Sequence, residues 1–515
     1  MIALWSNPEF IRNARAQLRP GRAIATACIC ATLSIVIGWA LSYQSRVATG
    51  PYGWGSELFQ VAFWLQALVL TAGGGIACIN SIHREKDQNT FDYQRVTRLT
   101  PLELTLGKLF GAPVFTYFVF LCLMPLAIFA IFAGKQEPLT VLMAYVVLLI
   151  GSLMIHALAL LISLLTVRGS HTGAILLLLA LLWGTSINGN SLQFFQVGPL
   201  GPFYAAQLAH RAGWENAAGE ALVRGGMPET TVDYDVAFGR TVGHVPVLIV
   251  LDLLFAGWFL LALVRNIKRD PNYYEVYSPV QSLVFALFLN LLFVAFMKWR
   301  EATAVDSQAF LLTLNTGVFS CLGLVAIRNR ERMRRILRAE EGTASSWLAT
   351  VWPAPLMIAG TLAAGLLIVL GIFYGRDSRL EWSVNLAVLR SLFFVAWITR
   401  DMQFLQWMGL RRGKHPLVMG VIFLTIFYVC ILIVMAPLDM FSRLERSAFS
   451  AFLVPSSAVY VLDHSAWVLR PAIWVAAFLV QWVLVAVFIG LQRKTIEELH
   501  SPATSAAAAP VPAHT

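Results

Sequence analysis

Apolar runs follow one another along the whole chain, separated by polar connections, and about twelve of them are long enough to cross a lipid bilayer. At a rise of about 1.5 Å per residue, a helix needs about 20 apolar residues to span the hydrocarbon core. The pattern therefore predicts an all-α polytopic membrane protein with about 12 transmembrane helices. The predicted spans are residues 24–43, 60–80, 109–133, 139–166, 173–188, 245–264, 279–297, 308–327, 355–374, 384–399, 417–436 and 471–491.

The composition excludes a soluble domain, and the charges predict an orientation. Of 515 residues, 58% are hydrophobic and 13% are charged, which is too few polar residues to cover a soluble surface. With both termini in the cytoplasm, about 25 lysines and arginines lie inside and about 12 outside, as the positive-inside rule favours. We therefore expect a multi-pass protein of the plasma membrane, in bacteria the inner membrane. The basic inner face indicates contact with anionic membrane lipid, and we expect no nucleic-acid partner.

The two ends of the chain differ in character. Asn7 and Pro8 supply a cap and a first turn, and they predict an amphipathic helix over residues 7–20 on the inner membrane surface. Its apolar face holds Phe10, Ile11, Ala14 and Leu18, and its opposite face holds Arg12, Arg15 and Arg19. The first apolar run is of span length and lacks a small-residue cleavage site, so we expect it to stay as a span. Residues 501–515 are rich in Ala, Pro and Ser, and they predict a disordered tail.

The segment between the second and third spans, residues 83–108, is charged and amphipathic. From Glu85 to Lys108 it reads EKDQNTFDYQRVTRLTPLELTLGK. Thr100, Pro101 and Glu103 predict a helix start, with a hydroxyl N-cap, a proline at the first position and a carboxylate at the third. Before it, three apolar residues alternate with three charged ones, which predicts a short helix lying flat at the interface with its apolar side toward lipid. These residues are Phe91, Val96 and Leu99, and Asp92, Arg95 and Arg98. The alternative is a solvated loop that merely connects two spans.

This segment resembles the coupling segment of ABC-2 type permeases, the membrane subunits of ABC exporters. The matching positions are Glu85, Thr90, Asp92, Thr97, Leu99, Thr100, Pro101, Glu103, Gly107 and Lys108. Asn89 departs from the family's usual Gly, and Arg98 departs from its usual first Pro. The resemblance implies that these residues, with Arg95 and Arg98, contact a cytoplasmic ABC ATPase, present as two copies or as two related chains. It also implies ATP and Mg on that partner and no cofactor on this chain. A similar interfacial helix precedes the first span in that family.

Three landmarks recur at a shift of roughly 245 to 255 residues, which predicts an internal duplication. Arg168-Gly169-Ser170-His171 recurs as Arg412-Gly413-Lys414-His415, Arg84-Glu85-Lys86 as Arg330-Glu331-Arg332, and the pair Pro199 and Tyr204 as Pro455 and Tyr460. We expect two parallel six-helix ABC-2 permease repeats, residues 1–270 and 271–500, related by an axis along the membrane normal. The second coupling-like segment, residues 328–354, carries Arg334, Arg335 and Glu341 but lacks the Thr-Pro and Gly-Lys elements of the first. We therefore expect the two halves to be unequal.

The resemblance also implies outer re-entrant regions before the sixth and twelfth spans, at residues 189–243 and 437–470. In the family such regions close the exit of the pathway. The residues expected at this outer gate are Phe194, Phe195, Pro199, Tyr204, Pro455 and Tyr460. The polar stretch at about residues 211–240 is interpreted as an outward-facing excursion.

The sequence offers no catalytic motif. Gly107-Lys108 lacks the upstream Gly and the following hydroxyl of a phosphate loop, and no cysteine, histidine or acid pattern suggests a metal site. Asp252 and Arg390 are the charges expected within spans, where a charge is costly and normally faces the bundle interior, although Asp252 could instead be an interfacial cap. His156 in the fourth span is either a packed hydrogen-bonding residue or, less favoured, a relay.

Three classes of function follow from these patterns. An ABC permease explains the coupling segment, the inner helix, the duplication and the missing nucleotide motif together. A secondary active transporter with 6+6 repeats would explain the spans and the duplication, but it needs titratable groups at membrane depth, of which the sequence suggests almost none. A membrane-embedded transferase would need clustered carboxylates or histidines at a water boundary. We therefore expect a transport subunit and not an enzyme.

Overall fold

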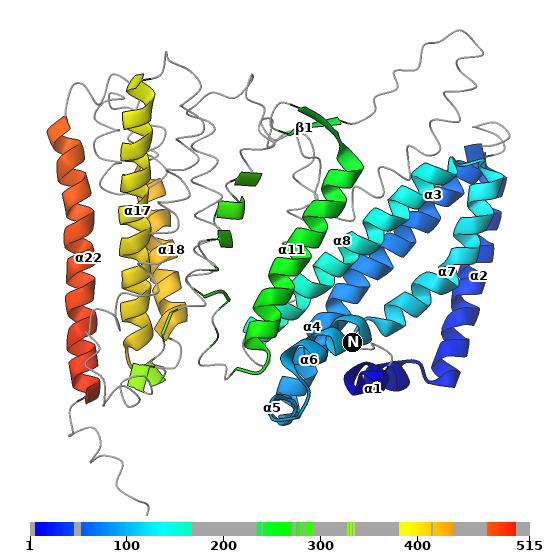
Figure 1. Cartoon of the computed structure of the whole chain (residues 1–515), viewed down its shortest axis with the longest axis horizontal. Coiled ribbons are helices and arrows are strands. Elements are labelled where there is room, and N and C mark those ends of the chain that lie inside the picture. The colour runs from blue at the N-terminus through cyan, green and yellow to red at the C-terminus, as the bar shows by residue number, and fades with distance from the viewer. Residues whose placement is uncertain are drawn as a thin grey trace, which may run out of the picture. The chain divides into compact units, whose positions relative to one another are not determined.

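The computed structural model describes residues 6–45, 53–166, 234–237, 240–269, 381–413, 416–435 and 471–500, together with short stretches between 274 and 334. The chain divides into two compact units, Met1–Arg269 and Asp270–Thr515. The described residues are almost entirely helical (Figure 1). An antiparallel pair of short strands is the exception to the expected all-α fold. In it β1 (Tyr234–Ala237) pairs with β2 (Arg240–Gly243), within and just after the stretch interpreted as an outward excursion.

Six helices in the described part of the chain are long and apolar enough to cross a membrane. They are Pro20–Ser42, Trp54–Asp87, Pro101–Ala133, Pro138–Leu165, Val245–Asn266 and Val475–Leu499. In position they match the first, second, third, fourth, sixth and twelfth predicted spans. The tenth and eleventh predicted spans fall in helices α17 (Glu381–Leu410) and α18 (Pro416–Met435). The fifth, eighth and ninth lie outside the described residues, and so does most of the seventh. The total of twelve and the duplication therefore stay predictions.

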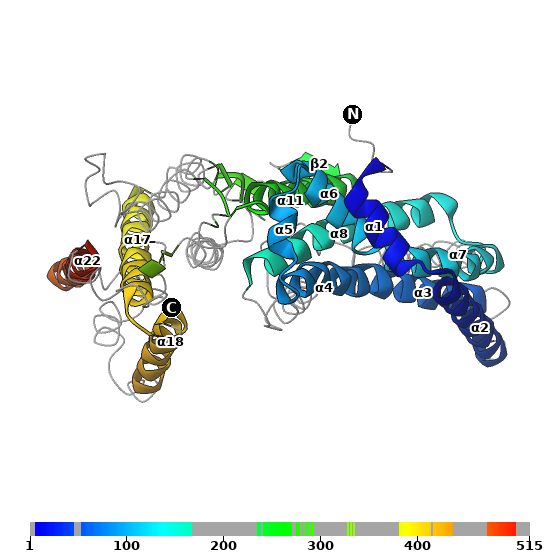
Figure 2. The same ribbon diagram turned by 90° about the horizontal axis from the view of Figure 1, so that it is seen from below.

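The first unit contains a bundle of long helices with a group of short ones at one end (Figure 1). Figure 2 shows three short helices, α1, α5 and α6, together at this end, which we call the α1 end. In chain order, the elements are α1 (Pro8–Gln17), α2 (Pro20–Ser45), α3 (Gly53–Leu68), η2 (Val69–Gly73), α4 (Gly74–Asp87), α5 (Phe91–Arg95), α6 (Pro101–Gly111), α7 (Val114–Ala133), α8 (Pro138–Leu165), β1, β2 and α11 (His244–Asn266). Helix α8 packs against α4 and α11, and α3 packs against α7.

The second span is longer than predicted because its helix continues in both directions past residues 60–80. Helices α3 and α4 join through the π-helical turn η2. The backbone oxygen of Leu70 in this turn lies 2.8 Å from His156 Nε2, and the hydroxyl of Tyr117 lies 3.2 Å from His156 Nδ1. A Cβ atom at Gly74 would lie 2.1 Å from His156 Nε2, so only glycine leaves room for the imidazole. Both ring nitrogens have partners, which confirms His156 as a packed hydrogen-bonding residue.

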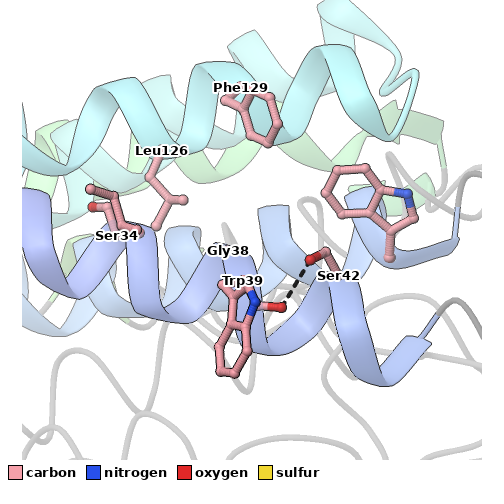
Figure 3. A pocket seen from close by; sticks show the side chains of 8 residues that line it. Ser34, Gly38, Trp39, Ser42, Leu126 and Phe129 are labelled. Carbon is pink, nitrogen blue, oxygen red and sulfur yellow. Dashed lines mark hydrogen bonds between the residues drawn. The ribbon is translucent and has the colours of Figure 1, made fainter.

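Helix α2 contributes little to the core of the first unit. Only 6% of its most apolar stretch is buried, and a groove of about 430 Å³ lies between its C-terminal half and helices α3 and α7. Figure 3 shows Leu126 and Phe129 of α7 across the groove from Ser34 and Trp39 of α2. The hydroxyl of Ser42 donates to the Trp39 carbonyl (2.8 Å), so it serves its own helix. Helix α2 contacts both α7 and α3, but most of its length is exposed.

The second unit contains α17, α18 and α22 (Pro471–His500) in its described part. A face of α17 that carries Arg400, Gln403 and Gln406 is buried and hydrogen-bonded. Arg400 bonds Gln481 of α22 (3.0 Å) and the hydroxyl of Tyr428 on α18 (3.0 Å). Gln403 accepts from Gln492 of α22 (2.6 Å), and the Gln406 amide bonds both the backbone N–H and the carbonyl of Arg328. Polar contacts therefore join the three helices along this face.

Candidate functional site

The turn after α4 sets the direction in which the coupling segment leaves the second span. Asn89 has a φ of 56°, the left-handed conformation that glycine adopts most easily. The Thr90 N–H bonds the Glu85 carbonyl (2.9 Å) and the Asn89 N–H bonds the Lys86 carbonyl (3.2 Å), which is the hydrogen-bond pattern of a Schellman motif. Asn89 therefore takes a conformation that asparagine and glycine adopt more easily than other residues.

Helix α5 presents one side to the protein and the other to the surroundings. Phe91 and Gln94 are buried, whereas Tyr93 is 75% exposed and Val96 is 82% exposed. The expectation that Phe91, Val96 and Leu99 share one lipid-facing apolar side is wrong. The helix has only five residues and ends at Arg95, so the two later residues do not continue its face. Its buried side is completed by a polar residue, Gln94, which sequence analysis did not select.

The start of α6 confirms the predicted capping box. Thr100 is the N-cap, Pro101 occupies the first helical position, and the Thr100 hydroxyl accepts from the Glu103 N–H (3.2 Å). The Glu103 carboxylate accepts in return from the Thr100 N–H (2.8 Å). The Glu103 carbonyl also accepts from the side chain of Asn7 (2.7 Å), the N-cap of α1. The capped end of α6 is therefore tied to the beginning of α1.

Helix α1 crosses α6 at two glycines that are four residues apart. A Cβ atom at Gly107 would lie 2.7 Å from Asn7 Oδ1 and 2.8 Å from Glu9 Cβ. One at Gly111 would lie 3.2 Å from Asn13 Cβ. Small residues at this spacing let two helices approach closely, as in small-xxx-small helix contacts. This close approach leaves no room for a side chain at residue 107, which explains why the residue is a glycine.

The face of α1 that contacts the protein is polar. Glu9 is buried, the Asn13 amide donates to the Glu9 carboxylate (3.1 Å), and the Gln17 amide donates to the Ala112 carbonyl (3.0 Å). These three residues were not selected from the sequence, although their spacing of four marks one side of a helix. The predicted apolar face, with Phe10, Ile11, Ala14 and Leu18, is half-buried beside it.

A buried cluster of charges joins α1, α4 and α6. The ammonium of Lys108 lies 2.5 Å from Glu85 Oε2 and 3.2 Å from Glu9 Oε1. Arg12 bonds both carboxylates, at 2.5 Å to Glu85 and 2.8 Å to Glu9. Gln94 of α5 completes the arrangement by donating to Glu85 Oε1 (2.7 Å). We call these five residues the Lys108 cluster.

The Lys108 cluster has no net charge, and most of its side chains are buried. Lys108 is 0% exposed and both carboxylates are buried, while half of the Arg12 side chain reaches solvent. Two acidic and two basic side chains balance each other. Burying ions costs several kcal/mol each unless partners compensate them, so removal of one member leaves an uncompensated charge. The cluster therefore fixes the relative positions of segments that lie up to 99 residues apart in the chain.

Two lysines hold the coupling segment to the neighbouring spans. Lys86 Nζ donates to the carbonyls of Ser163, Leu164 and Thr166 at the end of α8, at 2.7 to 2.9 Å. Lys268, just after α11, donates to the Thr97 carbonyl (2.8 Å). The turn of chain around α5 is thus attached to the ends of α4, α6, α8 and α11. The segment around α5 is therefore held in place by hydrogen bonds to several neighbouring helices at the α1 end.

The arginines of the coupling segment differ in their surroundings. Only 11% of the Arg95 side chain is exposed; it pairs with Asp92 (2.9 Å), and its guanidinium lies 5.7 Å from the Phe91 ring centre. Arg98 is exposed. Arg98 is therefore available to a partner, whereas Arg95 is mostly covered by its own segment.

Several other expected site residues are placed differently or lie outside the described residues. The outer-gate residues Phe194, Phe195, Pro199, Tyr204, Pro455 and Tyr460 lie outside them, as do Arg335 and Glu341 of the second coupling-like segment. Arg334 is described and half-buried, and Arg390 lies in α17. Asp252 is fully buried in α11, more than two turns from its first residue, so it does not cap this helix.

Arg400, which directly follows the predicted tenth span, is buried in the second unit, and its neighbour Asp401 is mostly buried. Arg400 is 5% exposed, and its guanidinium bonds Asp401 Oδ1 at 2.6 and 2.8 Å and lies 4.4 Å from the Trp397 ring centre. The hydroxyl of Tyr428 donates to the other Asp401 oxygen. The predicted tenth span ends at residue 399, whereas α17 continues to Leu410.

Comparison with known protein families, with curated proteins and with solved structures gives no match.

Proposed function

We propose that this chain is the membrane-spanning permease subunit of an ABC transporter, an exporter in which a separate cytoplasmic ATPase drives substrate across the membrane. In this proposal both termini and the α1 end face the cytoplasm, and the membrane is the plasma membrane of a bacterium. The ATPase is present as two copies or as two related chains and carries the ATP and Mg. The resemblance of residues 85–108 to the coupling segment of ABC-2 type permeases is the starting point.

The observation that carries the proposal is the combination of an exposed short helix with a rigid support. Tyr93 and Arg98 extend outward from the coupling segment, while Phe91 and Gln94 hold it to the protein. A loop that merely connects two spans needs no buried charge cluster beneath it. A helix that receives force from a partner needs such a cluster, because a flexible support would deform before the spans moved.

The Lys108 cluster provides a route by which such force reaches the spans. A push on α5 acts through Gln94 on Glu85 at the end of α4, and through Lys108 on α6. Glu9 and Arg12 carry the same displacement to α1, which is followed within three residues by α2. Since α2 has few contacts along its length, it can tilt at a small cost in packing. We infer that α2 and the third span respond first when the ATPase closes.

The test compares two charge reversals at exposed arginines. Arg98→Glu changes the proposed ATPase contact, and Arg19→Glu changes an exposed residue between α1 and α2. We expect both variants to be present in the membrane at wild-type amounts. Arg98→Glu should abolish co-purification of the ATPase or its transport-linked ATP hydrolysis, and Arg19→Glu should leave both within about twofold of wild type. Equal retention of ATPase by both variants would contradict the proposal.

An ion-driven secondary transporter is the second candidate, and the hydrogen-bonded group of Arg400, Asp401 and Tyr428, of which Arg400 is buried, favours it. Ion-coupled transporters use such membrane-depth groups, facing the bundle interior, to bind ions or substrate. All polar groups of this trio are hydrogen-bonded within the described second unit, which is equally consistent with a structural tie between α17, α18 and α22. The composition of the complex purified from native membranes distinguishes the candidates. A phosphate-loop ATPase in stoichiometric amount supports the permease, and its absence supports the ion-driven transporter.

A further inference from the structure

Asp252 is a buried acid in α11, a candidate membrane span, and the proposed coupling mechanism does not use it. It is the ninth residue of α11, about 12 Å along the helix axis from His244 at 1.5 Å per residue. Leu248, Leu251 and Ala256 share its buried side of α11. Val250, Leu253 and Leu254, on other sides of the helix, are 44 to 54% exposed. The carboxyl group therefore points into protein and not toward lipid.

Neither carboxyl oxygen of Asp252 has a hydrogen-bond partner among the residues that the structure describes. Helix α8, the main neighbour of α11, carries two titratable groups, and both are engaged elsewhere. Tyr145 donates to Gln66 (2.7 Å), and His156 is bonded to Tyr117 and to the Leu70 carbonyl. Helix α8 therefore supplies no charge to Asp252.

The other elements beside α11 place their charges away from Asp252 as well. Helix α6 carries Glu103, in the capping box, and Lys108, in its cluster. In the described elements that contact α11, and in α11 itself, the other charged or titratable residues are Arg240 of β2, which leads into the first turn of α11, and His244 and Arg265 at the two ends of α11. A carboxylate in such surroundings would be an isolated ion in a medium of low dielectric constant, at a cost that proteins avoid by neutralising the group. A divalent cation would require several more oxygen ligands.

We propose that Asp252 is a proton-binding site whose occupancy is coupled to the packing of α11 against α8. With α11 packed, the side chain is a neutral carboxylic acid. When α11 moves away and water enters, the acid transfers its proton to a water molecule, leaving a carboxylate and a hydronium ion. The reverse transfer accompanies repacking. Each cycle in which α11 opens and closes then releases and takes up one proton, independently of whether ATP or an ion gradient drives the movement.

The sign of the pH effect follows directly. Acid favours the protonated form and therefore the packed arrangement, and alkali favours the ionised form and therefore separation of α11 from α8. Asparagine has the shape of the protonated acid but cannot ionise. Asp252→Asn should thus behave at every pH as wild type does in acid.

Infrared spectroscopy of the purified chain in lipid nanodiscs tests the proposal, with no ATPase present. The difference spectrum between wild type and Asp252→Asn at neutral pH should contain the C=O stretch of a protonated carboxyl group. The control is Glu137→Gln, because hydrogen bonds, foremost with Thr140, hold the pKa of Glu137 below its usual value. Besides the side-chain amide bands of the new glutamine, its difference spectrum should contain carboxylate bands and no C=O stretch of a protonated carboxyl group. Carboxylate bands without a protonated carboxyl C=O stretch in the Asp252 difference spectrum would overturn the proposal.

Hydrogen exchange gives a second measurement that separates proton coupling from a purely structural role. After correction for the intrinsic pH dependence of exchange, protection of the α11 amides in wild type should fall at least severalfold between about pH 6 and about pH 9. Protection in Asp252→Asn should stay constant over this range. The same loss of protection in both proteins would show that Asp252 does not control the packing, and would overturn the coupling.

Discussion

Replacement of Lys108 by methionine removes the buried cation on which the cluster at the α1 end depends. Methionine fills a similar volume but leaves Glu9 and Glu85 with only Arg12 and neutral hydrogen-bond donors to compensate two negative charges. Arg12 is half exposed, so its attraction is weakened by solvent. In this variant the two buried carboxylates repel each other, because the guanidinium group of Arg12 is the only cation left to compensate them.

The magnitude follows from the burial of the pair. Two unit charges about 4 Å apart interact by roughly 4 kcal/mol at an effective dielectric constant of 20, and Lys108 is within that distance of both carboxylates. Loss of one member of a buried ion pair commonly costs about 3–5 kcal/mol. We expect Lys108→Met to lower the free energy of unfolding by that amount. Arg19→Met, at an exposed position, should change it by no more than about 0.5 kcal/mol.

Equilibrium unfolding in mixed detergent provides the measurement, together with a rescue variant. In Lys108→Met combined with Glu9→Gln and Glu85→Gln, no buried charge is left without a partner, so more than half of the lost stability should return. A loss below about 1 kcal/mol in the single variant, or no recovery in the triple variant, would refute the description of the cluster as buried and mutually dependent.

Two further predictions concern the backbone around the cluster. Gly107→Ala places a methyl group 2.7 Å from Asn7 Oδ1, so it should lower the free energy of unfolding by about 1–3 kcal/mol and reduce ATPase binding. Gly257→Ala, in α11 where no described atom lies within 4 Å, should raise it by up to about 1 kcal/mol; similar losses in both variants would argue against close contact of α1 and α6. At Asn89, with a φ of 56°, substitution by Val should cost about 1–2 kcal/mol and substitution by Gly should cost nothing measurable, as thermal unfolding of the two variants would establish. Equal stability of the Val and Gly variants would be incompatible with a left-handed residue there.

Local signals in the sequence were sufficient for helices and caps. The capping box of Thr100 and Glu103 could be predicted because it depends on residues three apart, and the spans could be predicted from the length of apolar runs. The Lys108 cluster could not, because its partners lie 23 and 99 residues away and each acid alone resembles an ordinary surface charge. The spacing of Glu9, Asn13 and Gln17 was a usable signal.

The end of the tenth span shows a different limitation. Arg400 and Asp401 directly follow the predicted tenth span, and helix α17 continues past them to Leu410. In the second unit the two side chains pair with each other and with Tyr428 and Gln481, which makes their burial tolerable. Hydropathy counts each charge as a cost and contains no information about such pairing. Pairs of this kind are found only when the helices are packed together.

Site-specific crosslinking at α5 tests the central claim most directly. A photo-crosslinking amino acid is placed at Tyr93, which is 75% exposed, and in a separate variant at Phe91, which is 3% exposed. After irradiation of native membranes, the crosslinked products are identified by mass spectrometry. The account predicts a phosphate-loop ATPase attached at residue 93, in at least tenfold excess over residue 91. A residue 93 that crosslinks only to lipid or to this chain itself, in membranes where the protein is active, would contradict it.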